Sequence, residues 1–285
     1  MNVEIAEERI RLLTDRYTID RAEGRAWTMR VEAFGTMARM TGLLSRPKDE
    51  EFEVVYRERR LQPFWRIASH AVCAYERARD YHIALAPEVQ GVSVEGVDRA
   101  IVDGKFTLRG LESCREEVRR EVFVDALGGG ADPGLSRYMQ YPGADATAET
   151  LAGFAREGTV VVPPQVRASG LVRDAVSDAI GKIEADRVLE ETVRLEAVEL
   201  VYRPVYAFRY RRGGKEAVVE FDALTDEVSV AGTTFEQHLG KILEPKFLLE
   251  FGAEAANIVI PGATVAKVLI LKGIEMHEKR KAEGG

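Results

Sequence analysis

Histidine close to cysteine is the first combination in this 285-residue chain that could support chemistry. His70 and Cys73 have a spacing seen in some metal sites, but residues of unlike parity on a strand point to opposite faces, so we do not expect them to share an ion. Neither Cys73 nor Cys114 has a base held against it in the local sequence, which favours small buried thiols over nucleophiles. The other histidines fall on separate expected elements: His82, His238 and His277.

The carboxylates of Asp222, Asp226 and Glu227 could suggest calcium, but they lack the alternating ligands and central glycine of an EF-hand loop. A turn with solvated acids is the simpler interpretation. The glycine run at residues 128–130 has no following lysine or helix placed to bind phosphate, and no nucleotide-binding motif occurs elsewhere. The sequence therefore predicts no catalytic residue, no cofactor and no metal.

Arginine gathers in two places, each of which could contact phosphates. The first group is Arg57, Arg59 and Arg60. The second is Arg209, Arg211, Arg212 and Lys215. With Tyr206 and Tyr210 to stack on bases, the second group could form a nucleic-acid-binding wing. The competing interpretation is a solvated hairpin tip whose charges prevent edge-to-edge aggregation.

Composition limits the classes of protein. A chain that is 46% hydrophobic and 31% charged is typical of a soluble globular protein. A net charge of -7 and a pI near 5.4 argue against a dedicated duplex-binding protein. Two cysteines give no disulfide framework, so we expect the cytoplasm. The acidic start does not resemble a signal peptide, and the apolar stretch 251–271 is too interrupted to predict a transmembrane segment.

The clearest structural signal lies in residues 196–230, where apolar residues alternate as in a half-buried strand. Gly213 and Gly214 can adopt positive φ and predict a tight hairpin turn. A second turn over residues 222–227 then leads to a short last strand. We therefore expect a small antiparallel meander. Its alternation is carried by Tyr206, Phe208, Tyr210, Val219, Phe221, Val228 and Val230.

A similar order of short motifs occurs earlier in the chain. EVVYR at residues 53–57 leads through Pro63 to VSVEG at 92–96, while ELVYR at 199–203 leads through Pro204 to VSVAG at 228–232. One interpretation is a degenerate internal duplication with inner loops of unequal length. The other is two unrelated hairpins of similar composition.

Periodicity predicts the remaining elements. Apolar spacing of three and four predicts helices over 6–13, 25–44, 111–126, 147–155 and 169–183, with Asp20 or a neighbour capping the second and Thr147 the fourth. Alternation predicts strands over 52–56, 64–75, 81–85 and 159–162, a turn at 76–80, and a hairpin at Asp103-Gly104. Residues 128–145, rich in glycine and proline, predict a long loop.

Beyond Gly232 the pattern predicts helices separated by Pro245 and by Pro261-Gly262, the last one running through Lys281. These helices carry more apolar residues than one face needs, so they lie inside the fold, form an interface with a partner or a second copy, or contact a membrane surface. The expected interface residues are Val265, Val268, Leu269 and Ile270.

The helix, strand, turn, strand order over about residues 169–230 resembles a PepSY-type module, whose sheet ends in a DAxTGE-like turn. The matching residues here are Asp222-Ala223-Leu224-Thr225-Asp226-Glu227, with Asp226 where the family pattern carries glycine. The resemblance implies an inhibitory or regulatory role. Typical members are exported or tethered to a membrane, which this sequence does not indicate.

Together these patterns predict an α+β protein with two helix-plus-antiparallel-meander units and a C-terminal helical segment. The expected divisions are 1–110, a connector over 111–168, 169–232 and 233–285. Because no set of nucleophile, base and oxyanion donor can be assembled, we expect a non-enzymatic scaffold, adaptor or regulatory subunit that acts through a protein partner or self-association. The other two hypotheses are nucleic-acid binding by the arginine-rich hairpin tips and an enzyme site beneath the 128–145 loop.

Overall fold

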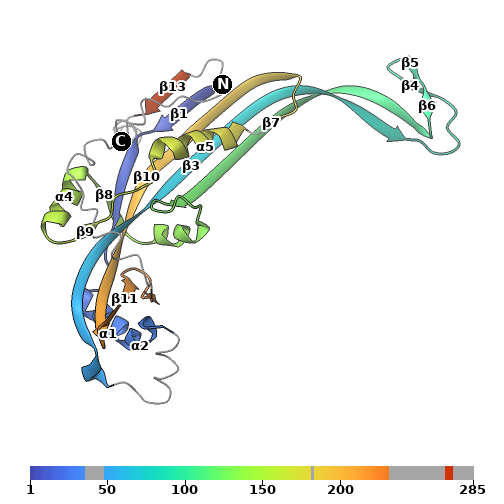
Figure 1. The fold of residues 1–285 in the computed structure, drawn as a ribbon. Helices are drawn as coiled ribbons and strands as arrows, with labels where there is room; N and C mark the ends of the chain where they lie inside the picture. The colour runs from blue at the N-terminus through green and yellow to red at the C-terminus, as the bar shows by residue number, and fades with distance from the viewer. Residues whose placement is uncertain (36–47, 181–182, 231–266, 272–285) are drawn as a thin grey trace, which may run out of the picture.

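A single large mixed β-sheet with long strands dominates the α+β fold (Figure 1). The computed structural model describes residues 1–35, 48–180, 183–230 and 267–271. The strands are β1 (Asn2–Ala6), β2 (Glu8–Leu13), β3 (Glu53–Ala84), β4 (Val92–Val94), β5 (Val97–Arg99), β6 (Ile101–Val102), β7 (Lys105–Asp125), β8 (Gly143–Ala146), β9 (Val160–Val161), β10 (Arg187–Arg212), β11 (Lys215–Asp222), β12 (Val228–Ser229) and β13 (Lys267–Leu271). The helices are α1 (Ile19–Thr28), α2 (Arg30–Ala33), α4 (Ala148–Arg156) and α5 (Ala168–Ile180), with 3-10 turns η1 (Asp49–Glu51) and η2 (Pro133–Gln140).

The main path of the sheet runs β12-β11-β10-β3-β7-β6 and is antiparallel throughout. β1 and β2 join the free edge of β10 in parallel, β8 continues from β2, and β9 pairs with β3. Strands from all four expected divisions of the chain take part in this one sheet.

β3 is one uninterrupted strand of 32 residues. The strands expected within it are confirmed, but the expected turn at residues 76–80 is wrong. Each of these residues pairs with β7, from Glu76 opposite Ser113 to Asp80 opposite Arg109. The ladder satisfies the backbone groups of the odd-numbered residues in a segment whose charged side chains had suggested a turn.

β7 replaces the helix expected over residues 111–126. Leu111, Cys114, Val118 and Val122 have helical spacing, but the whole segment pairs with β3 without a register shift. The helix expected over 6–13 is wrong for the same reason, because β1 and β2 lie side by side with β10. Tertiary strand pairing outweighs local propensity in both segments.

The other helices follow the sequence more closely. Thr147 caps α4 as expected, with its hydroxyl accepting from the Thr150 amide. α5 starts at Ala168 and buries Val172 and Val176 as expected. α1 begins earlier than expected, at Ile19, where Thr18 rather than Asp20 is the cap. The expected helix over 25–44 therefore divides into the end of α1 and the short α2, and its residues 36–44 lie outside the described ranges.

Both predicted hairpin turns are confirmed. Gly213 and Gly214 have φ of 54° and 75° between β10 and β11, and Asp103 and Gly104 have φ of 51° and 68° between β6 and β7. β12 completes the expected meander. The segment 128–145 is more ordered than the long loop expected, since it contains η2 and the start of β8.

No repeated meander is seen in the described residues. Residues 63–96 comprise most of β3 and the first strand, β4, of a separate β4–β5 hairpin, while residues 204–230 return directly through β11 to β12. The two VSV motifs therefore lie in different sheets. Most of the expected C-terminal helices lie outside the described residues, but Lys267–Leu271 forms a strand, β13, parallel to β1, where the last helix was expected.

Three apolar clusters cover the sheet. The largest lies under α5 and α4, a second under α1, and a third under η2. The second cluster buries the face of the meander that holds Tyr206, Phe208, Tyr210, Val219 and Phe221. The opposite face of the same strands is polar, and it holds the candidate site. Within the described part of the chain, no helix has the length and apolarity needed to cross a bilayer.

The turn at Gly213-Gly214 gives a direct stability prediction. Gly214→Ala should lower the free energy of unfolding by about 1 kcal/mol, because φ is +75° while no heavy atom within 4 Å would meet the new Cβ. Gly24→Ala in α1 also has open space but lacks positive φ, so it should raise stability by about 0.5–1 kcal/mol. Urea unfolding of both variants measures the difference, and equal effects would contradict the assigned turn.

Candidate functional site

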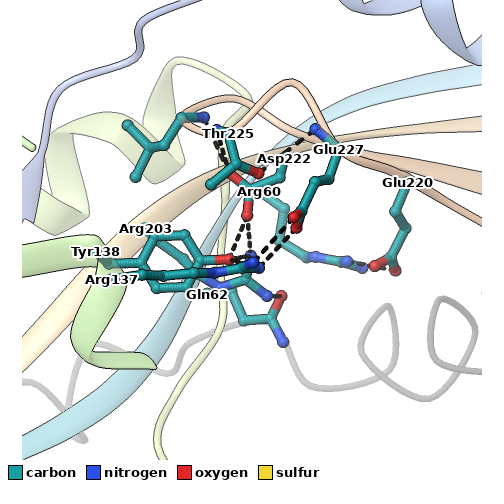
Figure 2. Close-up of polar contacts among 10 residues, drawn as sticks. Arg60, Gln62, Arg137, Tyr138, Arg203, Glu220, Asp222, Thr225 and Glu227 are labelled. Atoms are coloured by element: carbon teal, nitrogen blue, oxygen red, sulfur yellow. Dashed lines mark hydrogen bonds and ion pairs between the residues drawn. The ribbon is translucent and has the colours of Figure 1, made fainter. Parts of the chain in front are cut away.

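Three adjacent strands place charged side chains on one face of the sheet (Figure 2). Ala207 of β10 lies between Glu58 of β3 and Glu220 of β11, and Val205 lies between Arg60 and Asp222. Because the central residues are small and apolar, the longer flanking side chains can meet across β10. The sheet register alone therefore brings acids and arginines from distant parts of the chain together.

Asp222 is the centre of one half of this face. It is 7% exposed, and its Oδ1 accepts from the amides of Leu224 at 2.9 Å and Thr225 at 3.1 Å. Its Oδ2 accepts from the Tyr138 hydroxyl and from Arg203 Nη1, the latter at 2.7 Å. Both oxygens are thus doubly occupied, which leaves this carboxylate poorly suited to act as a general base.

The second half of the Asp222 network joins η2 to the meander. Arg203 Nη2 donates to Gln62 Oε1 at 3.0 Å, and its guanidinium lies 5.0 Å from the centre of the Tyr138 ring. Arg137 makes a bidentate contact with Glu227, with distances of 2.9 and 2.7 Å. These contacts fasten the 128–145 segment to the turn that follows β11, and we call the set of contacts of Arg137, Tyr138 and Arg203 the latch.

Glu58, Arg60 and Glu220 form a second, deeper cluster. Arg60 is 2% exposed, donates from Nη2 to Glu220 at 2.5 Å and places Nη1 3.6 Å from Glu58. Its Nε and Nη1 have no hydrogen-bond acceptor among the described residues. A buried arginine between two carboxylates is thus incompletely satisfied, which makes this cluster costly to keep charged.

Burial raises the pKa of Glu58 to about 7, and the nearby Glu220 carboxylate adds to the shift, while Arg60 opposes it. The carboxyl group therefore changes charge near neutral pH. Glu58 is only 5% exposed, so its change of charge takes place inside the buried cluster. Protonation of this side chain therefore makes the free energy of unfolding depend on pH, with no need for a bound substrate.

The two clusters together support a structural interpretation of this face. Neither includes a serine, cysteine or lysine placed as a nucleophile beside a base among the described residues. Nor do three or more histidine, cysteine, aspartate or glutamate side chains converge on a metal position in the described ranges. His70 contacts Glu117 at 2.6 Å, while Cys73 lies on the buried face of β3.

The predicted cationic residues at the second hairpin are brought together at its tip, but with acids between them. Arg209 and Arg211 contact Glu216 at 3.3 and 2.7 Å, and Arg212 contacts Glu51 at 2.8 Å. Arg211 also lies 3.6 Å from Glu53, so with Lys215 the tip sets four cations against three carboxylates. Its local positive charge is therefore small.

The tyrosines of the alternative nucleic-acid-binding wing, Tyr206 and Tyr210, have their rings buried beneath α1 on the opposite face, where they are not exposed to stack on bases. The first arginine group is dispersed as well. Arg57 pairs with Glu23, Arg59 with Asp15 and Arg60 with Glu220.

Of the predicted interface residues, Val265 lies outside the described residues. Val268, Leu269 and Ile270 belong to β13, where they pair through the backbone with Val3, Glu4 and Ile5 of β1. These three positions thus extend the sheet. Their role as an interface stays a prediction.

Sequence reasoning missed the roles of Glu58, Tyr138 and Arg203. A usable signal was present for Glu58 and Arg60, which are opposite charges two positions apart in a strand and so share a face. No local signal marks Tyr138, because only the folded 128–145 segment brings it to Asp222.

The sequence matches no protein-family model, and no curated protein or solved structure is detectably similar to it. The resemblance to a PepSY-type module therefore stays a prediction.

The raised pKa of Glu58 predicts how stability depends on pH. Between pH of about 4.5 and about 7, the folded protein retains a proton at Glu58 that the unfolded chain has released, so the free energy of unfolding should fall as pH rises through this window. Glu58→Gln should abolish this pH-dependent decrease in the free energy of unfolding, which amounts to up to about 3 kcal/mol. Denaturant unfolding at pH 5, 6, 7 and 8 measures the decrease in both proteins. The same pH dependence of the free energy of unfolding in the variant and the wild type would contradict the assignment.

Removal of the Tyr138 hydroxyl tests the latch. Tyr138→Phe should lower the free energy of unfolding by about 1–3 kcal/mol, because the buried Asp222 carboxylate loses one of its four donors. Limited proteolysis should then cut the 128–145 segment faster. Tyr141→Phe, whose ring packs on the same apolar cluster, is the matched control. Equal stability and equal cleavage in the two variants would show that the Tyr138–Asp222 contact does not stabilise the 128–145 segment.

Proposed function

We propose that the protein is a binding protein, acting as a scaffold, adaptor or regulatory subunit, and that it contacts a protein partner through a projecting β-arm. The arm comprises residues 77–84 of β3, residues 105–112 of β7 and the hairpins of residues 85–104 at its tip. Figure 1 shows it extending far from the helices and the rest of the sheet.

The single observation that carries this proposal is that, apart from the buried Phe106, the arm buries little against the described part of its own chain. β10 reaches only to Arg187, which pairs with Glu76, so between that point and the short β6 at the tip the described sheet has two strands. Residues 78–84 are all exposed. A two-stranded hairpin is at best marginally stable in water, which makes an arm of this length a poor element for stability alone.

The arm also presents apolar side chains to solvent. Leu111 and Val102 are each 66% exposed, and Tyr81 and Ile83 are about 40% exposed. Exposed apolar groups on a projecting element are typical of a surface that another protein covers. The exposed apolar residues of the arm are Tyr81, Ile83, Val97, Val102 and Leu111.

Polar contacts hold the arm in a defined shape. Glu112 accepts from the Tyr81 hydroxyl at 2.5 Å and from Arg77 Nε at 2.6 Å, which ties the two strands together. Gly110 allows the Tyr81 ring to lie close, since a Cβ there would approach the ring to 2.9 Å. A preformed surface binds with less loss of conformational entropy than a disordered one.

The other two hypotheses have less support. Nucleic-acid binding would use a hairpin tip whose arginines already contact carboxylates. An enzyme site beneath the 128–145 segment would fall on the Asp222 network, whose acceptor oxygens are occupied. The proposed compartment is the cytoplasm, because both cysteines are free thiols.

Site-specific photo-crosslinking in cells tests the proposed contact. A benzophenone side chain at Leu111 or at Val102 should give a discrete crosslinked product with one partner protein, because both positions lie on the exposed arm. The same group at Asp174 of α5, whose side chain is 72% exposed, is the control. With the benzophenone at Val102, Leu111→Asp should reduce the product without changing the unfolding midpoint. Products from Asp174 alone, or none from the arm, would contradict the proposal.

A further inference from the structure

Within the described part of the chain, the outer edge of β7 is open over its middle. β7 pairs with β3 along its full length, but among the described residues its other side pairs only near its ends, with β6 at Lys105 and Phe106 and with Ala131 at Val124. Between these contacts, no strand of the described chain lies against the edge. The side chains of residues 115–122 are exposed.

The free hydrogen-bonding groups of this edge belong to the odd-numbered residues. Asp132 donates its amide to the Phe123 carbonyl, and the Asp125 amide donates to Gly130, so odd residues face away from β3 at this end. The β3–β7 register has no shift, and the same parity therefore holds along the strand. The outward residues are Arg115, Glu117, Arg119 and Glu121.

The charges along this edge are complementary to a second copy of themselves. Residues 115–121 read Arg-Glu-Glu-Val-Arg-Arg-Glu. When two such strands run antiparallel with Val118 opposite Val118, every charged residue faces an opposite charge. The facing pairs are Glu117 with Arg119, Glu116 with Arg120 and Arg115 with Glu121, each formed twice by symmetry.

Neighbouring registers lack this property. A centre at Glu117 sets that residue against its own copy and Arg115 against Arg119. A centre at Arg119 sets that residue against its copy and Glu117 against Glu121. The centre at Val118 also places the odd-numbered residues of one copy opposite odd-numbered residues of the other. This arrangement is needed because the outward backbone groups of the odd-numbered residues must face each other to exchange hydrogen bonds.

We propose that the protein forms a symmetric dimer in which the β7 strands of two copies pair antiparallel about Val118 and join the two sheets into one. Val118 then occupies a non-hydrogen-bonded pair, where facing side chains lie closest. The exposed valine, 37% accessible in the single chain, would be covered by its copy.

Contacts within each chain are compatible with this dimer. Glu121 accepts from Arg66 at 2.6 Å, and Glu117 contacts His70 at 2.6 Å. Arg115 donates to Glu190 at 3.1 Å, and Arg119 lies 3.7 Å from Glu117 of its own chain. A carboxylate can accept from several donors and a guanidinium has five N–H groups, so the second copy would add contacts to these side chains without breaking those within each chain. The dimer contact lies at residues 115–121 and the partner contact on the arm beyond them, so either one can fail without the other.

Sedimentation velocity of the full chain tests the dimer. The wild type should show a reversible species of twice 31.7 kDa, and Glu117→Arg should raise the dissociation constant at least about tenfold because the new guanidinium would face Arg119 of the other copy, twice by symmetry. Adding Arg119→Glu should restore the dimer. Glu157→Arg, on the exposed residue that follows α4, makes the same change in net charge and should leave the mass unchanged.

A cysteine at the centre provides a second measurement. In a Cys114→Ser background, Val118→Cys should form an intermolecular disulfide when copper phenanthroline removes two electrons and two protons from the facing thiols, whereas Glu157→Cys should not. Circular dichroism checks that each variant is folded. The proposal would be overturned if the wild type is a monomer at about 100 μM, if Glu117→Arg leaves the dimer unchanged, or if adding Arg119→Glu does not restore the dimer. The charges would then serve to protect an open strand edge from aggregation.

Discussion

The antiparallel pairing of β3 with β10 is the contact on which the rest of the structure depends. It runs from Glu53 opposite Arg211 to Glu76 opposite Arg187. Every other part of the sheet attaches to one side of this ladder. β7 lines the free side of β3, while β1, β2 and β11 follow one another along the free side of β10. The arm begins where this ladder ends.

The ladder also sets two unlike faces next to each other. Tyr206 and Phe208 point into the aromatic cluster beneath α1, while Glu58 and Arg60 lie on the opposite face with Asp222. A slip of one residue would exchange the faces, burying charges among aromatic rings and leaving the arginine network without partners. The buried ions thus cost stability as a group but specify the register in which the long strands pair.

Local chemistry determined which features could be predicted from the sequence. The Gly213-Gly214 turn and the Thr147 cap were predictable because each depends on residues adjacent in the chain. β7 was not, since its apolar residues have helical spacing and only the neighbouring β3 makes it a strand. The site was predictable only in part. Asp222 was identified as a turn residue, but its contact with Tyr138 depends on two segments 84 residues apart in sequence.

The uninterrupted course of β3 is the claim that links the fold to the proposed function, and amide hydrogen exchange resolved by NMR tests it most directly. Since odd residues of β3 face β7, the amides of Arg77, Arg79, Tyr81 and Ile83 should be protected. The amides of Asp80 and His82 face the open side and should exchange rapidly. Uniformly rapid exchange from residue 76 to residue 84 would show that the strand ends at the body and that no ordered arm exists.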